Sequence, residues 1–213
     1  MNVIAINGLI GAGKDTVSDY ICENYGYHRL SFAEKLKDSV ANLFELDREM
    51  LEGKTEDSRR AREEELPFWT KELGRPVTPR YILQIYGTDC MRNGFYNNIW
   101  VAFVKKKIIN NPHVKFIITD ARFLNEGKMI KGLGGSVWRV RRGKDPEWVE
   151  AAAKVNQLDW KGAPMPYNDD PFMNGTFYVH QSERGMMGFD FDHIIDNDGS
   201  IPALYKKIDE IMK

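Results

Sequence analysis

The sequence predicts an α/β fold in which helices cover both faces of a parallel sheet. Short apolar strands alternate with helical segments along most of the chain, and parallel strands need crossovers of this kind. A glycine-rich turn separates the first strand from the first helix. Hydrophobic residues make up 42% of the 213 residues and charged residues 29%, which favours one packed domain with room for an inserted subdomain.

The first half of the chain supplies two strands and several helices. Residues 3–6 form the first strand, and the glycine-rich turn leads from it into a helix. A second strand is predicted near residues 29–32. Further helices are predicted around Leu36–Phe44, from Thr78–Pro79 to Cys90, and from Trp100 to Ile108. Residues 45–77 are charged and weakly patterned, which predicts a mobile loop or short helices.

The second half contains the clearest strand, at residues 114–119, and two more at 137–140 and 193–196. The helices predicted here are a short one capped by Asn125, one that starts at Asp145–Pro146, and one capped by Ser200. Residues 156–178 are rich in Gly, Pro, Asn and Asp and predict a long loop. Loops of this length in compact domains are usually functional lids or disordered segments.

The composition is balanced in charge and poor in cysteine. Thirty Lys and Arg against 31 Asp and Glu leave a net charge of −1, which argues against stable binding to nucleic acid or a membrane surface. Cys22 and Cys90 lack the spacing of a structural metal site, and we expect both to be free thiols in a reducing cytoplasm. No apolar run approaches the ~20 residues of a membrane helix, so we expect a cytoplasmic protein.

Residues 8–14 read Gly-Leu-Ile-Gly-Ala-Gly-Lys and match the phosphate-loop motif G-x-x-x-x-G-K between a strand and a helix. The glycines let backbone N–H groups converge on one anion, and the helix start adds its positive dipole end. Lys14 can then reach the β- and γ-phosphates of a nucleoside triphosphate. The ATP-binding residues predicted from this motif are Gly8, Gly11, Ala12, Gly13, Lys14, Asp15 and Thr16.

Asp15 stands where Ser or Thr normally binds Mg²⁺ in this motif. Its carboxylate either approaches the metal directly or through water, or it activates the acceptor. Thr16 is an alternative source of a hydroxyl ligand. A structural role is also open, because a negative charge is favourable at a helix start.

Polar residues that follow the predicted strands are the other site candidates, because ligands bind at the carboxyl ends of parallel strands. Asp120 is suited to bind Mg²⁺ or to orient the attacking oxygen. Arg122 is suited to recognise a phosphate through paired hydrogen bonds. The predicted catalytic residues are Lys14, Asp15, Asp120 and Arg122, and the predicted metal ligands are Asp15, Thr16 and Asp120.

Three further arginines are candidates for the triphosphate, because arginines from mobile segments neutralise charge during phosphoryl transfer. They are Arg141, Arg142 and Arg184, and any of them could instead be a solvated surface residue. Asn197 and Gly199 lie in a turn where adenine commonly rests, although a plain turn before a helix explains them equally well. His180 and Glu183 are expected to cap and brace the long loop.

The helical stretch around Gly87 is the predicted acceptor region. A glycine within a helix is locally unfavourable, so Gly87 indicates close approach of another group. Arg92 is a candidate for the acceptor phosphate. The predicted acceptor residues are Lys35, Gln84, Tyr86, Asp89, Arg92, Trp100 and Arg122. The aromatics Trp100 and Phe103 are also typical of a core.

Taken together, these motifs resemble the bacteriophage-type deoxynucleoside monophosphate kinases, a branch of the P-loop NMP-kinase fold. The resemblance rests on Gly13–Thr16, Gly87–Asp89 with Arg92 and Trp100, Asp120–Glu126, Arg141, His180–Glu183 and Asp196–Ser200. It spans nearly the whole chain in order. Residues 45–77 and 156–178 match no family segment.

The resemblance implies a three-layer P-loop kinase fold with a five-stranded parallel sheet, within a single domain over residues 1–213. It implies an acceptor-binding insertion at about residues 33–110 and a moving lid at about residues 143–186. The implied reaction is ATP + dNMP → ADP + dNDP with Mg²⁺, on small nucleotide substrates. It also suggests a role in nucleotide supply during phage replication, and it leaves a homodimer open.

Two other functions fit the phosphate loop. One is a kinase of another small phosphorylated metabolite, such as phosphomevalonate or dephospho-coenzyme A, which would use the same loop. The other is a nucleotide-gated switch or a nucleic-acid-dependent ATPase. The near-neutral charge and the short chain count against the second.

Overall fold

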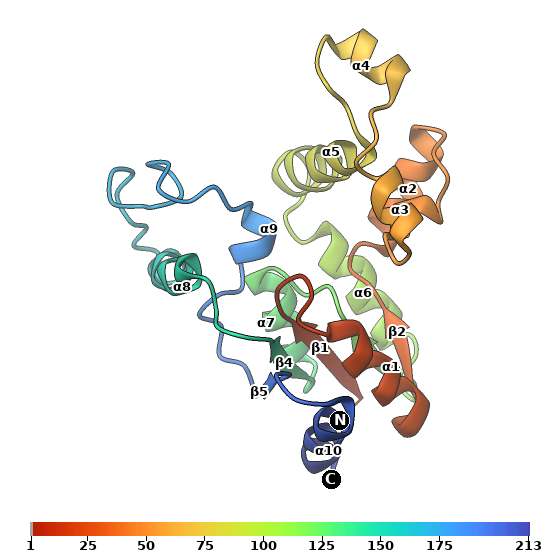
Figure 1. Cartoon of the computed structure of the whole chain (residues 1–213), viewed down its shortest axis with the longest axis vertical. Helices are drawn as coiled ribbons and strands as arrows, with labels where there is room; N and C mark the ends of the chain where they lie inside the picture. The colour runs from red at the N-terminus through yellow and green to blue at the C-terminus, as the bar shows by residue number, and fades with distance from the viewer. Residues whose placement is uncertain (1) are drawn as a thin grey trace. The chain divides into compact units, whose positions relative to one another are not determined.

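The computed structural model describes residues 2–213, and the chain divides into two compact units. Residues 2–31 together with 108–213 form the sheet unit, and residues 32–107 form the helical unit. The strands and helices of both carry their labels in Figure 1.

The sheet unit contains five parallel strands, as predicted. They are β1 (Val3–Asn7), β2 (Tyr27–Leu30), β3 (Lys115–Ile118), β4 (Ser136–Arg141) and β5 (His193–Asp196). Their order in the sheet is β2-β3-β1-β4-β5, so β1 lies in the centre. Ile4 pairs with Ile117 on one side and with Ser136 on the other. All five residues of β1 are buried, which agrees with a strand covered on both faces.

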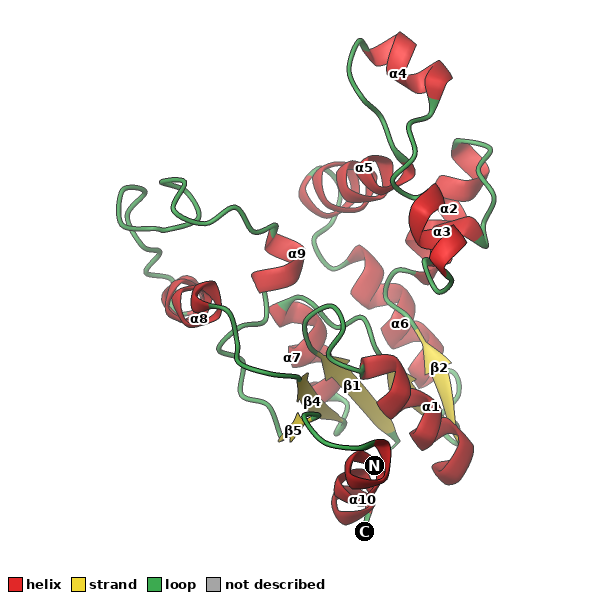
Figure 2. Ribbon diagram, viewed as in Figure 1, coloured by secondary structure: helices red, strands yellow, loops and turns green. Residues whose placement is uncertain are grey.

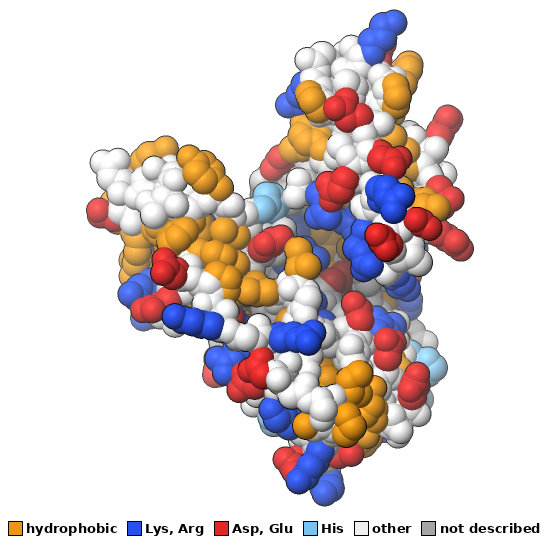
Figure 3. Space-filling model, viewed as in Figure 1, with side chains coloured by type: hydrophobic (Ala, Val, Ile, Leu, Met, Phe, Trp, Pro, Cys, Tyr) orange, Lys and Arg blue, Asp and Glu red, His pale blue; other side chains and the backbone are white. Residues whose placement is uncertain are grey.

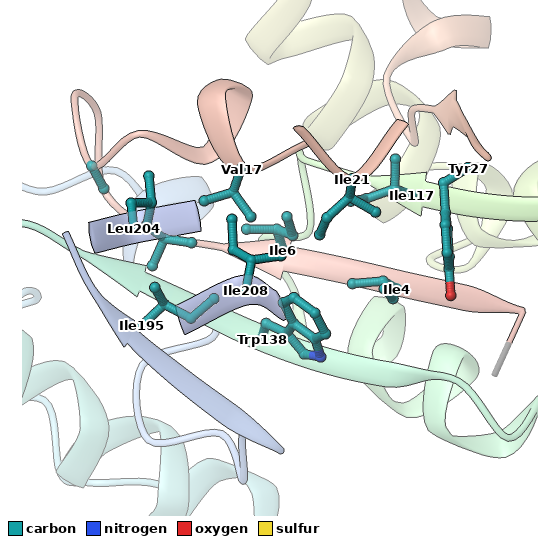
Figure 4. Packing of buried hydrophobic residues seen from close by; sticks show 12 residues of the cluster. Ile4, Ile6, Val17, Ile21, Tyr27, Ile117, Trp138, Ile195, Leu204 and Ile208 are labelled. Atoms are coloured by element: carbon teal, nitrogen blue, oxygen red, sulfur yellow. The ribbon is translucent and has the colours of Figure 1, made fainter. Parts of the chain in front are cut away.

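Helices α1 (Lys14–Tyr25) and α10 (Ile201–Met212) pack against each other and cover one face of the sheet. Their apolar side chains meet those of the strands in one core (Figure 4), formed by Ile4, Ile6, Val17, Ile21, Trp138, Leu204 and Ile208 among others. The Tyr20 and Tyr25 hydroxyls both donate to Asp209 Oδ1, at 2.8 and 2.7 Å. These hydrogen bonds connect α1 to α10 beside the apolar core.

Helix α7 (Leu124–Gly132) packs on β1 and β4 from the other face, with Ile130 fully buried (Figure 1). The prediction that Asn125 caps this helix is wrong. The helix already begins at Leu124, and the Glu126 carboxylate accepts hydrogen bonds from the backbone N–H groups of Arg122 and Phe123, at 2.7 and 3.1 Å. A carboxylate inside the first turn therefore satisfies the donors that a cap would have served.

Helix α8 (Glu147–Trp160) continues into the range predicted as loop, so the prediction for residues 156–160 is wrong. Asn156 is buried, and its side-chain amide donates to the carbonyls of Arg184 and Met187 at 2.7 and 2.9 Å. These long-range contacts stabilise a helical end that the local composition disfavours. Residues 161–180 form a long loop (Figure 2), and α9 (Gln181–Arg184) follows it.

The helical unit consists of short segments around a small core. Its elements are α2 (Glu34–Leu43), the 3₁₀ helix η1 (Met50–Glu52), α3 (Glu56–Ala61), α4 (Pro67–Leu73), α5 (Pro79–Gln84) and the π-helix η2 (Ile85–Asn93). The last helix, α6 (Ile99–Ile109), runs across the boundary of the two units. Thr78 caps α5 as predicted, since its side chain accepts from the Tyr81 N–H. Residues 45–77 thus contain three short helices joined by turns and irregular segments.

The core of the helical unit is formed by Val40, Leu51, Val77, Ile82 and Leu83. Acidic and basic side chains are mixed on the face of the molecule that Figure 3 shows. Both cysteines, Cys22 and Cys90, are free thiols. No helix within residues 2–213 has the length and apolar character needed to cross a bilayer.

Candidate active site

The phosphate loop connects β1 to α1 at the carboxyl end of the central strand. Gly8 is needed because a Cβ there would lie 2.5 Å from the Val140 carbonyl oxygen of the neighbouring strand. Gly13 has φ 96° and ψ 21°, a left-handed conformation that costs a residue with a Cβ about 1–2 kcal/mol. Since α1 begins at Lys14, its first backbone N–H groups are available to an anion.

The turn after β5 supports this loop. The Asn197 side-chain amide donates to the Ala12 carbonyl at 3.0 Å, and a Cβ at Gly13 would lie 2.3 Å from the same amide nitrogen. The Asp198 carboxylate accepts from the Gly143 N–H, which joins the turns that follow β4 and β5. Asn197 is one of the residues predicted for ATP binding, and in this structure its side chain holds the loop backbone. Gly199 is exposed in the same turn.

Lys14 has its ammonium folded back onto the loop, where Nζ donates to the Leu9 carbonyl at 2.9 Å. Burial lowers the pKa of Lys14, and the positive charge of Arg122 lowers that pKa further. The carboxylates of Asp15 and Glu183 act in the opposite direction. The ammonium is therefore set between one cation and two anions, close to where the phosphates of a nucleotide would bind.

A pocket lies over the phosphate loop within the sheet unit. It is lined by Asn7, Gly8, Leu9, Ile10, Lys14, Thr119, Ala121, Arg122, Ser182 and Glu183. The structure thus brings together three residues that the sequence pointed to: Gly8, Lys14 and Arg122. Ser182 and Glu183 come from α9, which the sequence placed in a lid. The motif His180–Glu183 belongs to the family resemblance, but it did not indicate a position beside Lys14.

Asn7, the last residue of β1, is a second residue that the sequence reasoning missed. It is buried, and its Nδ2 donates to the Ala121 carbonyl at 2.8 Å. This bond joins the end of β1 to the segment that carries Asp120 and Arg122. Its position directly before Gly8 is the signal that could have identified it, since the rule about strand ends applies to β1 as well.

Asp120 follows β3, and its Oδ2 accepts a hydrogen bond from the Ser31 hydroxyl at 2.6 Å. Ser31 follows β2 directly, and β2 and β3 are paired neighbours. The two side chains therefore meet at the carboxyl edge of the sheet. Asp120 is held in a defined orientation by this bond, and Ser31 was not among the predicted site residues.

Asp15 projects from the first turn of α1 and pairs with Arg29 of β2, at 3.0 Å from Oδ1 to the guanidinium. Arg29 also forms an ion pair with Asp19 at 2.7 Å, and the Arg29 Nη2 donates to the backbone carbonyl of Asp15. The Asp15 side chain remains 80% exposed. Its first partner is thus an arginine that the sequence reasoning did not identify. The ion pair with Arg29 supports a structural role for Asp15 at the start of α1.

The residues here fit a magnesium ion in their donor chemistry. Thr16 supplies a hydroxyl and Asp120 a carboxylate, and Mg²⁺ prefers oxygen ligands of this kind. In kinases this ion is usually bound by one or two protein oxygens together with phosphate oxygens and water. A closed cage of side chains is therefore not required. Asp15 would have to exchange its contact with Arg29 before it could act as a direct ligand.

Two arginines predicted for the triphosphate are engaged elsewhere. Arg141 forms an ion pair with Asp196 of the adjacent strand at 2.7 Å. The Arg184 guanidinium lies over the Phe172 ring, 4.3 Å from its centroid, and burial lowers the pKa of Arg184. Neither side chain lines the pocket over the phosphate loop. Both are placed by partners distant in sequence, which the sequence alone did not show. Arg142 is exposed at the end of β4.

Of the acceptor candidates, Arg122 lies in the sheet unit beside the phosphate loop, and the others lie in the helical unit, where several are already bound to neighbours. A Cβ at Gly87 would lie 2.7 Å from the Leu36 side chain, and the Trp100 indole N–H donates to the Gly87 carbonyl at 3.0 Å. The predicted close approach at Gly87 is therefore confirmed, with residues of the same chain. Trp100 is 4% exposed, so the structure gives it a core position and we leave it out of the proposed acceptor set.

Arg92 is buried at 7% exposure and donates to the Asn97 carbonyl at 3.3 Å. Lys35 pairs with Asp38 at 2.9 Å on the exposed side of α2. Asp89 is exposed and accepts a weak hydrogen bond from Asn93 at 3.4 Å. The other two candidates, Gln84 and Tyr86, are half-buried near the start of η2.

Relatives of viral origin resemble the chain in sequence. A protein of Acanthamoeba polyphaga mimivirus, provisionally named deoxynucleotide monophosphate kinase, is 32% identical over 153 residues, which cover 67% of this chain and 75% of that protein. The deoxynucleoside-5'-monophosphate kinase of Escherichia phage T5 is 33% identical over 55 residues, or 26% of this chain and 22% of that kinase. No protein-family model matches the chain.

Solved structures give weaker likenesses. The TT1252 protein from Thermus thermophilus is 16% identical with a TM-score of 0.45, and the comparison covers 99% of this chain and 95% of that one. The dephospho-CoA kinase from Campylobacter jejuni is 15% identical with a TM-score of 0.43, over 99% and 95%. Likenesses this weak carry no argument about the reaction.

Proposed function

This chain belongs to the deoxynucleoside monophosphate kinase family, and from that premise we propose which of its residues move the γ-phosphate of ATP onto a deoxynucleoside monophosphate. One observation carries the proposal: Lys14 and Arg122 line one pocket with the phosphate loop. Backbone N–H groups, an ammonium and a guanidinium together form a site for a chain of phosphate oxygens.

ATP binds with its β- and γ-phosphates in the loop between Gly8 and Thr16. Lys14 exchanges its hydrogen bond to the Leu9 carbonyl for phosphate oxygens. Arg122 lies close enough to Lys14 to lower the pKa of its ammonium, and from there it neutralises charge on the migrating phosphoryl group. Phosphoryl transfer needs little beyond this positioning and electrostatic stabilisation.

Thr16 and Asp120 would hold Mg²⁺, with Asp15 as a third candidate. When bound, the ion neutralises part of the triphosphate charge and orients the γ-phosphate for in-line attack. The Ser31 hydroxyl fixes the Asp120 carboxylate for this task. The pairing of Asp15 with Arg29 gives Asp15 a second task, which is to join the start of α1 to β2.

The acceptor binds to the helical unit in this proposal. Arg92 recognises its phosphate, because a buried guanidinium is suited to paired hydrogen bonds with phosphate oxygens. Residues Lys35, Gln84, Tyr86 and Asp89 remain candidates for contacts to the base or sugar.

The lid is proposed to exclude water, which would otherwise compete as the acceptor and hydrolyse ATP. Met186 and Met187, which follow α9, are fully buried, so we expect this end of the predicted lid to stay in place. The moving part in this proposal is the loop at residues 161–180. A homodimer, a cytoplasmic location and a role in phage nucleotide supply remain predictions, as does the lack of stable nucleic-acid binding.

The test is a panel of acceptors with ATP and Mg²⁺ in a coupled assay of ADP release. All four dNMPs and the corresponding ribonucleotides are compared with dephospho-coenzyme A and with no acceptor. We expect saturable turnover with at least one dNMP and little hydrolysis without acceptor. Turnover with dephospho-coenzyme A alone, or ATPase activity stimulated only by DNA, would replace the proposed reaction with one of the two other functions.

A further inference from the structure

Glu183 places a carboxylate in the pocket that is otherwise set up for anions. It lines this pocket together with Lys14 and Arg122, so the charged lining consists of two cations and one anion. Its negative charge acts on the Lys14 ammonium, which identifies the two groups as electrostatic neighbours. A carboxylate beside a phosphate site repels a bound anion, so its presence in this pocket calls for another explanation.

The backbone next to Glu183 is fixed by contacts at the C-terminal end of α9. A Cβ at Gly185 would lie 2.9 Å from the Arg122 carbonyl oxygen, so the segment packs closely on the strand-end loop. The Asn156 amide holds the carbonyls of Arg184 and Met187 at 2.7 and 2.9 Å. The carboxylate is therefore kept at the pocket rim by a docked segment.

No structural partner accounts for the Glu183 carboxylate. Within residues 2–213 it has no ion pair and no side-chain hydrogen bond, and only its backbone N–H is used, by the His180 carbonyl at 2.9 Å. The residue is exposed, so no buried environment requires a partner for its charge. The remaining consequence of that charge is its field in the pocket.

We propose that Glu183 makes this pocket selective for magnesium-complexed ATP over free ATP. Free ATP carries about −4 charges at neutral pH and the magnesium complex about −2, so a fixed negative charge repels the free form more strongly. Lys14 and Arg122 alone would attract both forms. The inference rests on the proposed binding of ATP at the phosphate loop.

The experiment measures the Kd of ATP by calorimetry at low ionic strength, once with EDTA and once with excess MgCl₂. Wild-type protein is compared with Glu183→Gln and Glu183→Asp. We expect Glu183→Gln to bind free ATP about fivefold more tightly than wild type and the magnesium complex only about twofold more tightly, because the repulsion scales with the charge of the ligand. Glu183→Asp keeps the charge and should retain the wild-type ratio of the two constants.

The matched control is Glu210→Gln, which removes an exposed carboxylate of α10 outside the pocket and should leave both constants unchanged. The effect of Glu183→Gln should shrink in high salt. Equal ratios in wild type and Glu183→Gln would overturn the proposal, as would equal tightening of both ATP forms. Glu183→Ala serves as a second neutral variant if Glu183→Gln proves unstable. Failure of wild type to bind either ATP form would instead overturn the proposed function.

Discussion

The phosphate loop and the acceptor region differ in what they present to a ligand. The loop presents main-chain N–H groups at a helix start, and its conformation depends on glycines such as Gly8 and Gly13. The acceptor region presents side chains, and the buried Arg92 already donates to a carbonyl of its own unit. A backbone site can lose one side chain and keep its fold. A site of interlocked side chains loses stability and affinity together.

The largest effect is expected at Lys14. Lys14→Ala removes the ammonium that reaches the phosphates and should lower kcat by about 100- to 1000-fold, the range typical of losing one such group. Because its hydrogen bond goes only to the Leu9 carbonyl, the melting temperature should change little. Steady-state kinetics and a thermal melt check both statements. Normal turnover in this variant would contradict the assignment of the phosphate loop.

A second test asks whether ATP affinity depends on the backbone conformation of the phosphate loop or only on the stability of the protein. Gly13→Ala adds about 1–2 kcal/mol of left-handed strain and places a Cβ against the Asn197 amide that supports the loop. Gly26→Ala is the matched control, because Gly26 is also left-handed, with φ 69°, and a Cβ there meets no atom within 4 Å. By denaturant titration both variants should lose stability, and Gly13→Ala should lose more because its Cβ also meets the Asn197 amide. Only Gly13→Ala should lose ATP affinity, and equal affinities would argue against a main-chain site.

A third test addresses the helical unit. Arg92→Ala should raise the KM for dNMP about tenfold while changing the KM for ATP less than twofold, because only the acceptor phosphate loses its partner. It should also destabilise the protein by about 1–3 kcal/mol, since a buried hydrogen-bonded group is removed.

Trp100→Phe is the comparison for Arg92→Ala, because it also removes one donor to a carbonyl of the same unit. It should lower stability by about 1 kcal/mol and leave the dNMP KM unchanged. If KM rises equally in both variants, the effect of Arg92 is structural. If Arg92→Ala affects ATP more than dNMP, Arg92 does not belong to the acceptor site.

The smallest effect is expected for the carboxylates that share Arg29. Asp15→Asn and Asp19→Asn each remove one exposed ion pair, so each should lower stability by at most about 1 kcal/mol. Only Asp15 adjoins Lys14 in the loop. A several-fold lower kcat, or a weaker response to Mg²⁺, in Asp15→Asn alone would support a catalytic role. Identical kinetics in both variants would leave Asp15 with the structural role that Arg29 indicates.

Local patterns predicted the sheet well and the ends of some helices poorly. The strand at residues 193–196 was predicted with its observed bounds, because a short apolar run between turns depends little on its surroundings. Helix α8 was cut short in the prediction, since the contacts of Asn156 that stabilise its end come from residues 184 and 187. The cap at Thr78 was found from sequence because its partner is only three residues away.

The phosphate loop could be identified from local sequence, because the convergence of its N–H groups follows from glycines and a helix start within a few residues. The side-chain partners around the loop depend on the three-dimensional packing. Arg29 meets Asp15, Arg141 meets Asp196 and Glu183 joins the pocket because separate strands and helices end at the same edge of the sheet. Such meetings depend on strand order and packing, which no local spacing encodes.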